Sequence, residues 1–430
     1  MFITWRAVAA VGMAVPLAAT SSGGNVALPW FFLVALLALL DVAVAPSPRS
    51  VAVARDVPPS VRLTQSTATT LAIINLGKRR ARGIVRDAWP PSAGAVSDRH
   101  RLDIPPGERR LFTTELCPTR RGDRTAGPVT LRLLGPLGLA GRQLSIAVPA
   151  RLRVLPEFAS RRHLPSRLAR LRELDGRAAV QIRGPGSEFD SLREYVIGDD
   201  VRSIDWRATA RRADVAVRTW RPERDRHVFI LLDTSRTSAV RVGEAPRLDA
   251  SLEATLLLAA LASHAGDRVQ VVAFDRRVRE RVAGATGSAL IPLLADRLAP
   301  LEPRLLEMDW AGAVAAIQAH TSQRALVLLL TTVDPASVEA GMLRSLAPII
   351  RKHQVLVASV DDPELAEISA LRVGASDLYG AAAATRFSLE RGATVLRLRH
   401  AGAEVLSADP DHFAPAVADA YLALKAAGKL

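Results

Sequence analysis

Three oxygen-bearing side chains stand at alternate positions after an apolar run. They are Asp233, Ser235 and Thr237, within the stretch FILLDTSRTSAV. Alternate residues of an extended segment point in the same direction, so one carboxylate and two hydroxyls can converge on a hard cation such as Mg2+. An octahedral ion needs further oxygens from other segments. The hypothesis of a metal site therefore depends on the fold around this loop.

The loop follows the first of several strand-like segments between residues 227 and 430. The strand-like runs read HVFILLD, RVQVVAFD, RALVLLLTT and QVLVASVD, and they alternate with segments whose apolar residues have helical spacing. Continuous apolar strands that alternate with helices predict a doubly wound, mostly parallel α/β sheet of the Rossmann type. Ligands of such sheets bind at the carboxyl ends of the strands, where the Asp233 loop falls.

Two apolar segments open the chain. Residues 26–45 are long enough to cross a hydrocarbon core of about 30 Å, and their one acid, Asp41, is near the end, where it can reach the membrane interface or a partner helix. Residues 7–19 are shorter and contain Pro16. Two interpretations stay open for them, a second spanning helix or the apolar region of a signal peptide.

The charges beside these segments predict an orientation. Arg49 and Arg55 follow the second segment, whereas the turn SSGGN between the two segments is uncharged. Positive charge favours the cytoplasmic side of a membrane. We therefore expect a multi-pass protein of the inner (plasma) membrane, with its C-terminal domains in the cytoplasm. The single cysteine, Cys117, cannot form an internal disulfide, which fits a reducing compartment.

Four regions follow from these patterns in the 430 residues. Residues 1–46 form a transmembrane helical hairpin. Residues 47–154 contain short alternating stretches, such as Val129, Leu131 and Leu133, that predict a β-sandwich. Residues 155–226 are a linker and signature segment that begins with a basic amphipathic helix, either solvated or in contact with the membrane. Residues 227–430 form the α/β domain.

The signature segment carries acids and arginines in balance. Its candidate interaction residues are Glu188, Arg193, Glu194, Tyr195, Asp199, Asp200, Arg202, Asp205 and Trp206. Each carboxylate has a guanidinium close in the sequence that can hold it ionised. The pattern therefore predicts a salt-bridge network that docks the domains on each other or binds a partner.

Composition and missing motifs narrow the function. The net charge of +14 comes almost wholly from arginine with acids interleaved, which favours a membrane-proximal basic face over a nucleic-acid surface. The sequence contains no P-loop, HExxH, CxxC or GxSxG motif, and no nucleophile–base pair can be named. We therefore expect a non-enzymatic interaction protein without a small-molecule substrate. The alternatives are a hydrolase that uses Asp233 and a nucleic-acid-binding protein.

The runs EFDSLREYVIGDD, RSIDWRATAR, WRPERD and LLDTSRTS together resemble the hallmark of the bacterial domain-of-unknown-function family 58. This resemblance implies N-terminal membrane helices, a β-rich segment and a C-terminal domain similar to von Willebrand factor type A. It also implies a scaffold-like, accessory role beside a MoxR-type AAA+ ATPase and other membrane proteins.

The same resemblance implies how a metal site would be built. Type A domains that bind metal add a threonine before a later helix and an aspartate after the fourth strand to an Asp-x-Ser-x-Ser loop. Met308 stands at the expected threonine and Thr332 at the expected aspartate, with Asp334 two residues further on. A thioether is unsuited to Mg2+. The resemblance thus implies a degenerate metal ion-dependent adhesion site of Asp233, Ser235, Thr237 and Asp334, with Mg2+ held weakly at most and no other cofactor.

Overall fold

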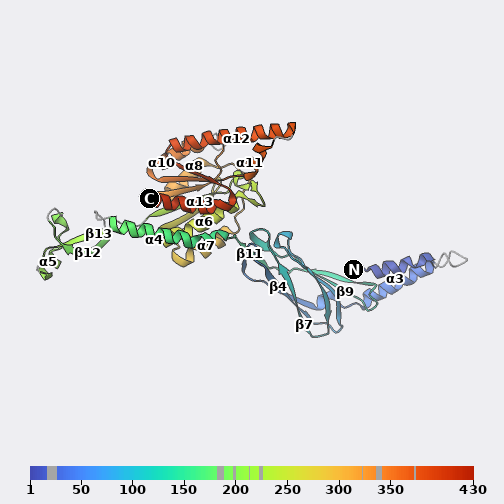
Figure 1. Cartoon of the computed structure of the whole chain (residues 1–430). Helices are drawn as coiled ribbons and strands as arrows, with labels where there is room; N and C mark the ends of the chain where they lie inside the picture. Colours follow the sequence, from blue (N-terminus) through green and yellow to red (C-terminus); the bar gives the residue numbers. More distant parts are fainter. Residues whose placement is uncertain are drawn as a thin grey trace. The chain divides into compact units, whose positions relative to one another are not determined.

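The computed structural model describes residues 1–16, 27–181, 188–196, 200–212, 214–221, 226–321, 323–335, 341–371 and 374–430. They form two compact units, Met1–Glu157 and Phe158–Leu430, whose elements are labelled in Figure 1. Each unit has its own core.

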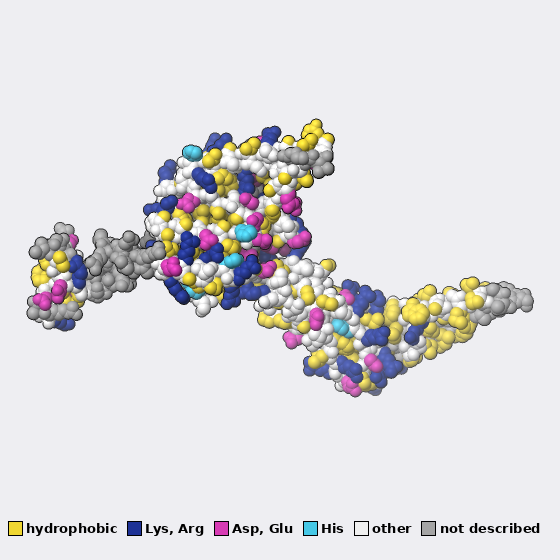
Figure 2. Space-filling view, viewed as in Figure 1, with side chains coloured by type: hydrophobic (Ala, Val, Ile, Leu, Met, Phe, Trp, Pro, Cys, Tyr) yellow, Lys and Arg dark blue, Asp and Glu magenta, His cyan; other side chains and the backbone are white. Residues whose placement is uncertain are grey.

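A helical hairpin opens the N-terminal unit. Helix α1 (Trp5–Gly12) packs against α3 (Ala27–Val44), and the Trp30 indole Nε1 donates to the Ala10 carbonyl at 2.8 Å. Among the described residues, α3 is the one helix that is long and apolar enough to cross a membrane. Large apolar side chains cover its surface, as the yellow atoms of Figure 2 show, and Phe32 is 66% exposed. Residues 17–26, where the first predicted spanning segment would end, lie outside the described part.

A β-sandwich follows the hairpin. Its strands are β1 (Phe2–Ile3), β2 (Val51–Asp56), β3 (Ser60–Arg62), β4 (Thr67–Asn75), β5 (Ala81–Asp87), β6 (Arg99–Ile104), β7 (Arg109–Leu116), β8 (Gly122–Thr125), β9 (Val129–Leu134), β10 (Ala140–Ile146) and β11 (Arg151–Leu155). The sheets are ordered β1-β10-β9-β5-β6, β2-β4-β7 and β3-β11-β8. Val129, Leu131 and Leu133 are fully buried, as their alternation predicts. The sequence analysis did not foresee β1, which precedes the first helix and pairs with β10.

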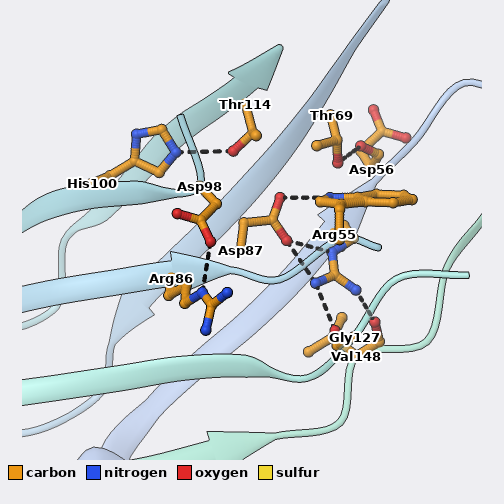
Figure 3. A network of polar contacts seen from close by, with 11 residues as sticks. Arg55, Asp56, Thr69, Arg86, Asp87, Asp98, His100, Thr114, Gly127 and Val148 are labelled. Carbon is orange, nitrogen blue, oxygen red and sulfur yellow. Dashed lines mark hydrogen bonds and ion pairs between the residues drawn. The ribbon is translucent and has the colours of Figure 1, made fainter. Parts of the chain in front are cut away.

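Arg55 was predicted to contribute positive charge beside the membrane segment, but the structure buries it. Its side chain and that of Asp87 are fully buried, and Arg55 Nη2 lies 2.6 Å from Asp87 Oδ1 (Figure 3). The guanidinium also donates to the carbonyls of Gly127 and Val148 and lies over the ring of Trp89. Because these acceptors surround it inside the sandwich, Arg55 contributes to the core and not to the membrane-proximal charge.

A six-stranded sheet forms the centre of the C-terminal unit. Its strands are β14 (His227–Asp233), β17 (Arg268–Phe274), β18 (Val278–Val282), β19 (Ala325–Leu330), β20 (Gln354–Val360) and β21 (Glu404–Ala408), in the order β18-β17-β14-β19-β20-β21. The edge strand β18 is antiparallel and the other five are parallel. Numbered along the domain, the order is 3-2-1-4-5-6, the order of a doubly wound sheet. The predicted mostly parallel sheet is thus confirmed.

Helices cover both faces of this sheet. On one face, the core includes residues of α6 (Arg247–His264), α7 (Leu290–Leu298) and α13 (Pro410–Ala426). On the other, it includes residues of α8 (Trp310–His320), α10 (Met342–Lys352) and α12 (Ala375–His400). The short helix α11 (Pro363–Ala370) packs against α12. The carboxyl ends of the strands are left to loops, which include the Asp233 loop.

The predicted basic amphipathic helix is α4 (Leu164–Gln181). Leu164, Leu168 and Leu171 pack against the core of the sheet domain, and Arg167 pairs with Asp419 of α13 at 2.7 Å. The domain itself therefore covers the described leucines of α4, and these side chains are not available to a membrane.

The signature segment forms a small β-hairpin with a helix inside it. Strand β12 (Glu188–Glu194) pairs antiparallel with β13 (Ala216–Arg221), and α5 (Trp206–Arg212) lies between them in the chain. The Asp205 carboxylate accepts hydrogen bonds from the backbone N–H groups of Arg207 and Ala208, both at 3.0 Å. It therefore caps the start of α5.

The other candidate residues of the signature segment differ in exposure, and the structure does not describe the side chains of all of them. Trp206 is 67% exposed, and Tyr195, Arg193, Glu194 and Asp200 are also exposed. Asp199 lies outside the described residues, and the structure describes Glu188 and Arg202 by their backbone alone. Exposed aromatic side chains such as Trp206 are found where proteins bind partners.

Candidate functional site

The Asp233 carboxylate is buried at the carboxyl end of β14 and is 1% exposed. It accepts three hydrogen bonds. The Ser235 backbone N–H donates to Oδ1 at 2.7 Å, and the hydroxyls of Thr237 and Thr331 donate to Oδ2 at 3.1 Å and 2.6 Å. Both carboxylate oxygens are thus engaged inside the domain.

The two hydroxyls of the opening motif converge on this carboxylate, as their alternate spacing predicts. Ser235 is 1% exposed, and its Oγ lies 3.2 Å from Thr237 Oγ1. A turn of 3-10 helix over Arg236–Ala239 follows, and the Ser238 hydroxyl donates to the Asp233 carbonyl at 2.7 Å. The loop is therefore a closed network of short-range hydrogen bonds.

The remaining positions of the predicted metal site form no hydrogen bond with Asp233 among the contacts of the described residues. Thr331, one residue before the predicted position of Thr332, supplies the hydroxyl that reaches Asp233. Met308 is 9% exposed and belongs to the apolar core beside α8. Asp334 is half-buried, and its charge acts on Arg247. The structure therefore brings together Asp233, Ser235 and Thr237 of the predicted set, and it adds Thr331, which the sequence analysis missed by one residue.

Burial and hydrogen bonding act on Asp233 in opposite directions. Desolvation raises the pKa of the Asp233 carboxyl above its ordinary value of 3.8, while the hydrogen bonds from Ser235, Thr331 and Thr237 oppose that rise. The net direction is upward, so the three donors offset only part of the cost of burying this carboxylate.

A second loop closes over the Asp233 loop. Two backbone hydrogen bonds join the loops. The Arg236 backbone N–H donates to the Leu306 carbonyl, and the Arg304 backbone N–H donates to the Thr234 carbonyl, both at 2.8 Å. The Arg236 guanidinium also pairs with Glu307 at 2.8 Å. This loop turns Leu305 outward, where it is 80% exposed. We call the exposed side chains of Arg236, Arg304, Leu305 and Glu307 the sheet-edge surface.

The residues at this edge do not fit a complete Mg2+ shell. The loop offers one carboxylate, and the hydroxyls of Thr237 and Ser238 donate to Asp233 itself. Thr331, after β19, donates to the same carboxylate, whereas the Thr234 hydroxyl is buried without a hydrogen-bond partner among the described residues. A six-coordinate hard cation prefers several oxygens that are free to turn toward it. Within the described part of the chain, no group of three or more His, Cys, Asp or Glu side chains is placed to hold a metal ion.

A second buried carboxylate, Asp41 of α3, has a different role from the one predicted. It is 1% exposed, and it accepts hydrogen bonds from the backbone N–H groups of Leu137 at 2.8 Å, Leu139 at 2.8 Å and Ala140 at 2.9 Å. Asp41 thus binds the turn between β9 and β10 and does not face a lipid interface or a partner helix. Its partners lie almost a hundred residues further along the chain, so no local pattern reveals them.

The other end of the hairpin contacts the same turn. The Thr4 hydroxyl donates to the Gly138 carbonyl at 2.8 Å, and the Thr4 N–H donates to the Leu139 carbonyl at 2.9 Å. Both ends of the hairpin are therefore fixed to one turn of the sandwich.

The strand order and the Asp-Thr-Ser loop at the end of the first strand define a von Willebrand factor type A-like domain. The chain belongs to the family described as protein of unknown function DUF58, whose sequence model matches residues 191–407, half of the chain. The predicted resemblance is thus confirmed.

Similar proteins include two mycobacterial ones. Uncharacterized protein Rv1480 of Mycobacterium tuberculosis is 27% identical over 190 residues, which are 44% of this chain and 59% of that protein. Uncharacterized protein Mb1516 of Mycobacterium bovis gives the same values. The chain thus spans 59% of the length of these relatives.

Similar solved structures include two that align with almost half of the chain. The SpRpn10 VWA domain is 12% identical, with 45% of this chain and 92% of that chain covered and a TM-score of 0.29. The conserved hypothetical protein BatB from Bacteroides thetaiotaomicron is 14% identical, with 46% and 98% covered and a TM-score of 0.28.

Proposed function

We propose that the protein is a membrane-anchored, non-enzymatic interaction protein, which binds a protein partner through the sheet-edge surface of its type A-like domain. The observation that carries the proposal is the closure of the Asp233 loop. The carboxylate is used by three internal donors, while Leu305, Arg236 and Glu307 face solvent above it. Apolar contacts within a polar rim are a feature of protein interfaces, and Leu305 between Arg236 and Glu307 could supply one such contact. The partner that the family resemblance implies is a MoxR-type AAA+ ATPase.

The hairpin supports the membrane anchor. Helix α3 has 18 residues, a length of about 27 Å at the rise of an α-helix, and its exposed side chains are almost all apolar. Because Thr4 and Asp41 contact the same turn, a chain that enters the bilayer after Thr4 must return before Asp41. This geometry favours two spanning segments over one, and a retained first segment over a cleaved signal.

The orientation also has support from Arg6 and Arg142, which the sequence analysis did not use. Arg55 is buried, but Arg6, Arg49 and Arg142 lie at the end of the hairpin that joins the sandwich. The sequence between α1 and α3 is uncharged over residues 20–25. By the positive-inside rule, the sandwich and the type A-like domain belong in the cytoplasm.

Reporter fusions test the anchor and its direction. A cytoplasmic reporter fused after Leu430 should be active, and the full chain should resist extraction from membranes by alkaline carbonate. A second fusion between residues 20 and 25 should report the opposite side. Periplasmic activity of the fusion after Leu430 would reject the orientation, and release by carbonate would reject the integral anchor.

Affinity capture of the full chain from detergent-solubilised membranes, with and without ATP, tests the interaction. Arg236→Glu should reduce the amount of AAA+ ATPase captured by about tenfold, as expected for a charge reversal within an interface. Arg241→Glu is the matched control, because Arg236 and Arg241 are both 52% exposed and each pairs with an exposed glutamate. Equal capture by both variants would reject the sheet-edge surface as the binding site.

The buried acid gives a second test of the same loop. Asp233→Ala should also weaken capture, because removing the acceptor of three hydrogen bonds releases the loop below Arg236. The melting temperature of each variant separates loss of binding from loss of fold. Turnover of any substrate that disappears with Asp233→Ala, while the fold is kept, would favour the hydrolase alternative.

A further inference from the structure

Five basic side chains surround the point where the hairpin joins the sandwich, and we call them the basic collar. They are Arg6, Arg49, Lys78, Arg79 and Arg142, from α1, the segment after α3, the turn between β4 and β5, and β10. In Figure 2, dark blue side chains gather on the sandwich next to the yellow hairpin. The collar therefore assembles from segments that are far apart in the sequence.

Backbone contacts hold the collar at the end of α3. Arg79 Nη1 donates to the Val44 carbonyl at 2.5 Å, and Arg142 Nε donates to the Val42 carbonyl at 3.0 Å. The Leu76 N–H donates to the Ser50 carbonyl at 2.9 Å, which places the β4–β5 turn beside the helix end. These guanidinium groups complement the negative end of the α3 dipole and keep N–H donors for another acceptor.

The collar lacks acidic partners within the described residues. Its arginines and lysine form no ion pair there with a carboxylate, whereas the neighbouring Arg80 pairs with Asp103 at 2.5 Å. The acid closest in sequence to the helix end, Asp41, is turned into the β9–β10 turn. The collar thus presents uncompensated positive charge.

An apolar side chain accompanies these charges. Leu76 opens the turn that carries Lys78 and Arg79, and it is 69% exposed. An exposed leucine next to basic residues, at the base of an apolar helix, matches the interface of a bilayer, where acyl chains meet charged headgroups.

We propose that the basic collar binds the phosphates of anionic phospholipid headgroups and seats the sandwich on the membrane surface. This inference rests on the proposed membrane anchor. Juxtamembrane arginine and lysine residues are attracted to anionic leaflets, and a guanidinium forms bidentate hydrogen bonds with a phosphate. The hairpin brings the collar to the depth at which these phosphates lie.

Thermal unfolding of the full chain in an uncharged detergent tests the collar. Short-chain phosphatidylglycerol should raise the melting temperature more than short-chain phosphatidylcholine, and added salt should remove the difference. The variant Arg6→Gln/Arg49→Gln/Lys78→Gln should need about tenfold more phosphatidylglycerol for the same shift. The control Arg99→Gln/Arg101→Gln/Arg120→Gln removes three exposed arginines of β6 and the turn after β7, and it should behave as the unaltered chain does.

Each other outcome overturns the inference. Equal shifts with the two lipids, or equal losses in the two variants, would reject a specific collar. Equal shifts with inorganic phosphate would indicate a site for free anions, and equal shifts with polyglutamate would indicate an acidic protein partner. Failure of the anchor is seen separately, because a chain without an integral hairpin would be extracted by alkaline carbonate whatever its lipid preference.

Discussion

Three buried carboxylates, two in the N-terminal unit and one in the type A-like domain, accept hydrogen bonds from different kinds of donor. In the N-terminal unit, Asp41 accepts only backbone N–H groups, and Asp87 pairs with the buried guanidinium of Arg55. In the type A-like domain, Asp233 accepts one backbone N–H and two threonine hydroxyls. Backbone and guanidinium donors have fixed directions, whereas a hydroxyl can rotate and can also accept.

This difference separates two structural acids from the acid of the loop that we propose for recognition. Asp41 and Asp87 bind chain segments that would otherwise leave buried donors unpaired. The donors of Asp233 are of the kinds that surround a metal in related loops, but here they face the carboxylate itself. The comparison predicts that the first two acids contribute strongly to stability and the third contributes weakly.

The largest effect is expected at Asp87. Asp87→Ala should lower the free energy of unfolding by about 3–5 kcal/mol, because it leaves the buried guanidinium of Arg55 without its counter-charge. Denaturant unfolding of the full chain in detergent would measure this loss. Asp103→Ala is the control, since that carboxylate pairs with Arg80 at the surface and should have little effect. Similar losses in both variants would contradict the assignment of Asp87 to the core.

A smaller effect is expected at Asp41. Asp41→Ala should lower the free energy of unfolding by about 2–3 kcal/mol, because the N–H groups of Leu137, Leu139 and Ala140 lose their acceptor. Hydrogen exchange of these three amides should become faster, and Asp41→Asn, which keeps one acceptor oxygen, should be intermediate. Unchanged exchange in Asp41→Ala would show that the hairpin is held to the turn by other contacts.

The smallest effect is expected at Asp233, and it depends on pH. Because burial raises the folded-state pKa above the ordinary 3.8, protonation favours the folded state. This contribution is present below the unfolded-state pKa and is lost as the pH rises through the folded-state pKa. Asp233→Asn has no such loss, so from about pH 4 upward its stability should improve relative to the unaltered chain, by about 1 kcal/mol. A pH-independent difference would contradict the direction of the pKa shift.

Much of the type A-like sheet could be predicted from the sequence, because its central strands are continuous apolar runs. Strands β14, β17, β19 and β20 are buried on both faces and were found by this pattern. The edge strands β18 and β21 were missed, because they are partly exposed and carry charged residues. The convergence of Ser235 and Thr237 on Asp233 could be predicted from their alternate spacing alone.

Residue partners were harder to predict than strands. Thr331 and Thr332 are adjacent hydroxyls, and only the register of β19 decides which of them faces Asp233. Arg55 was assigned by its closeness in sequence to the apolar helix, yet its partner Asp87 lies on another strand. The contacts of Asp41 and the assembly of the basic collar likewise depend on the fold of the sandwich, which sequence spacing does not reveal.

The central claim is that internal donors occupy Asp233, so that the loop serves recognition and not metal binding. Calorimetric titration of the full chain with Mg2+ and Mn2+ tests it most directly. We expect no tight binding by the unaltered chain, and increased affinity in Met308→Thr/Thr331→Asp, which adds a hydroxyl and a second carboxylate at the edge of the sheet. Micromolar binding by the unaltered chain that is lost in Asp233→Ala would contradict the account.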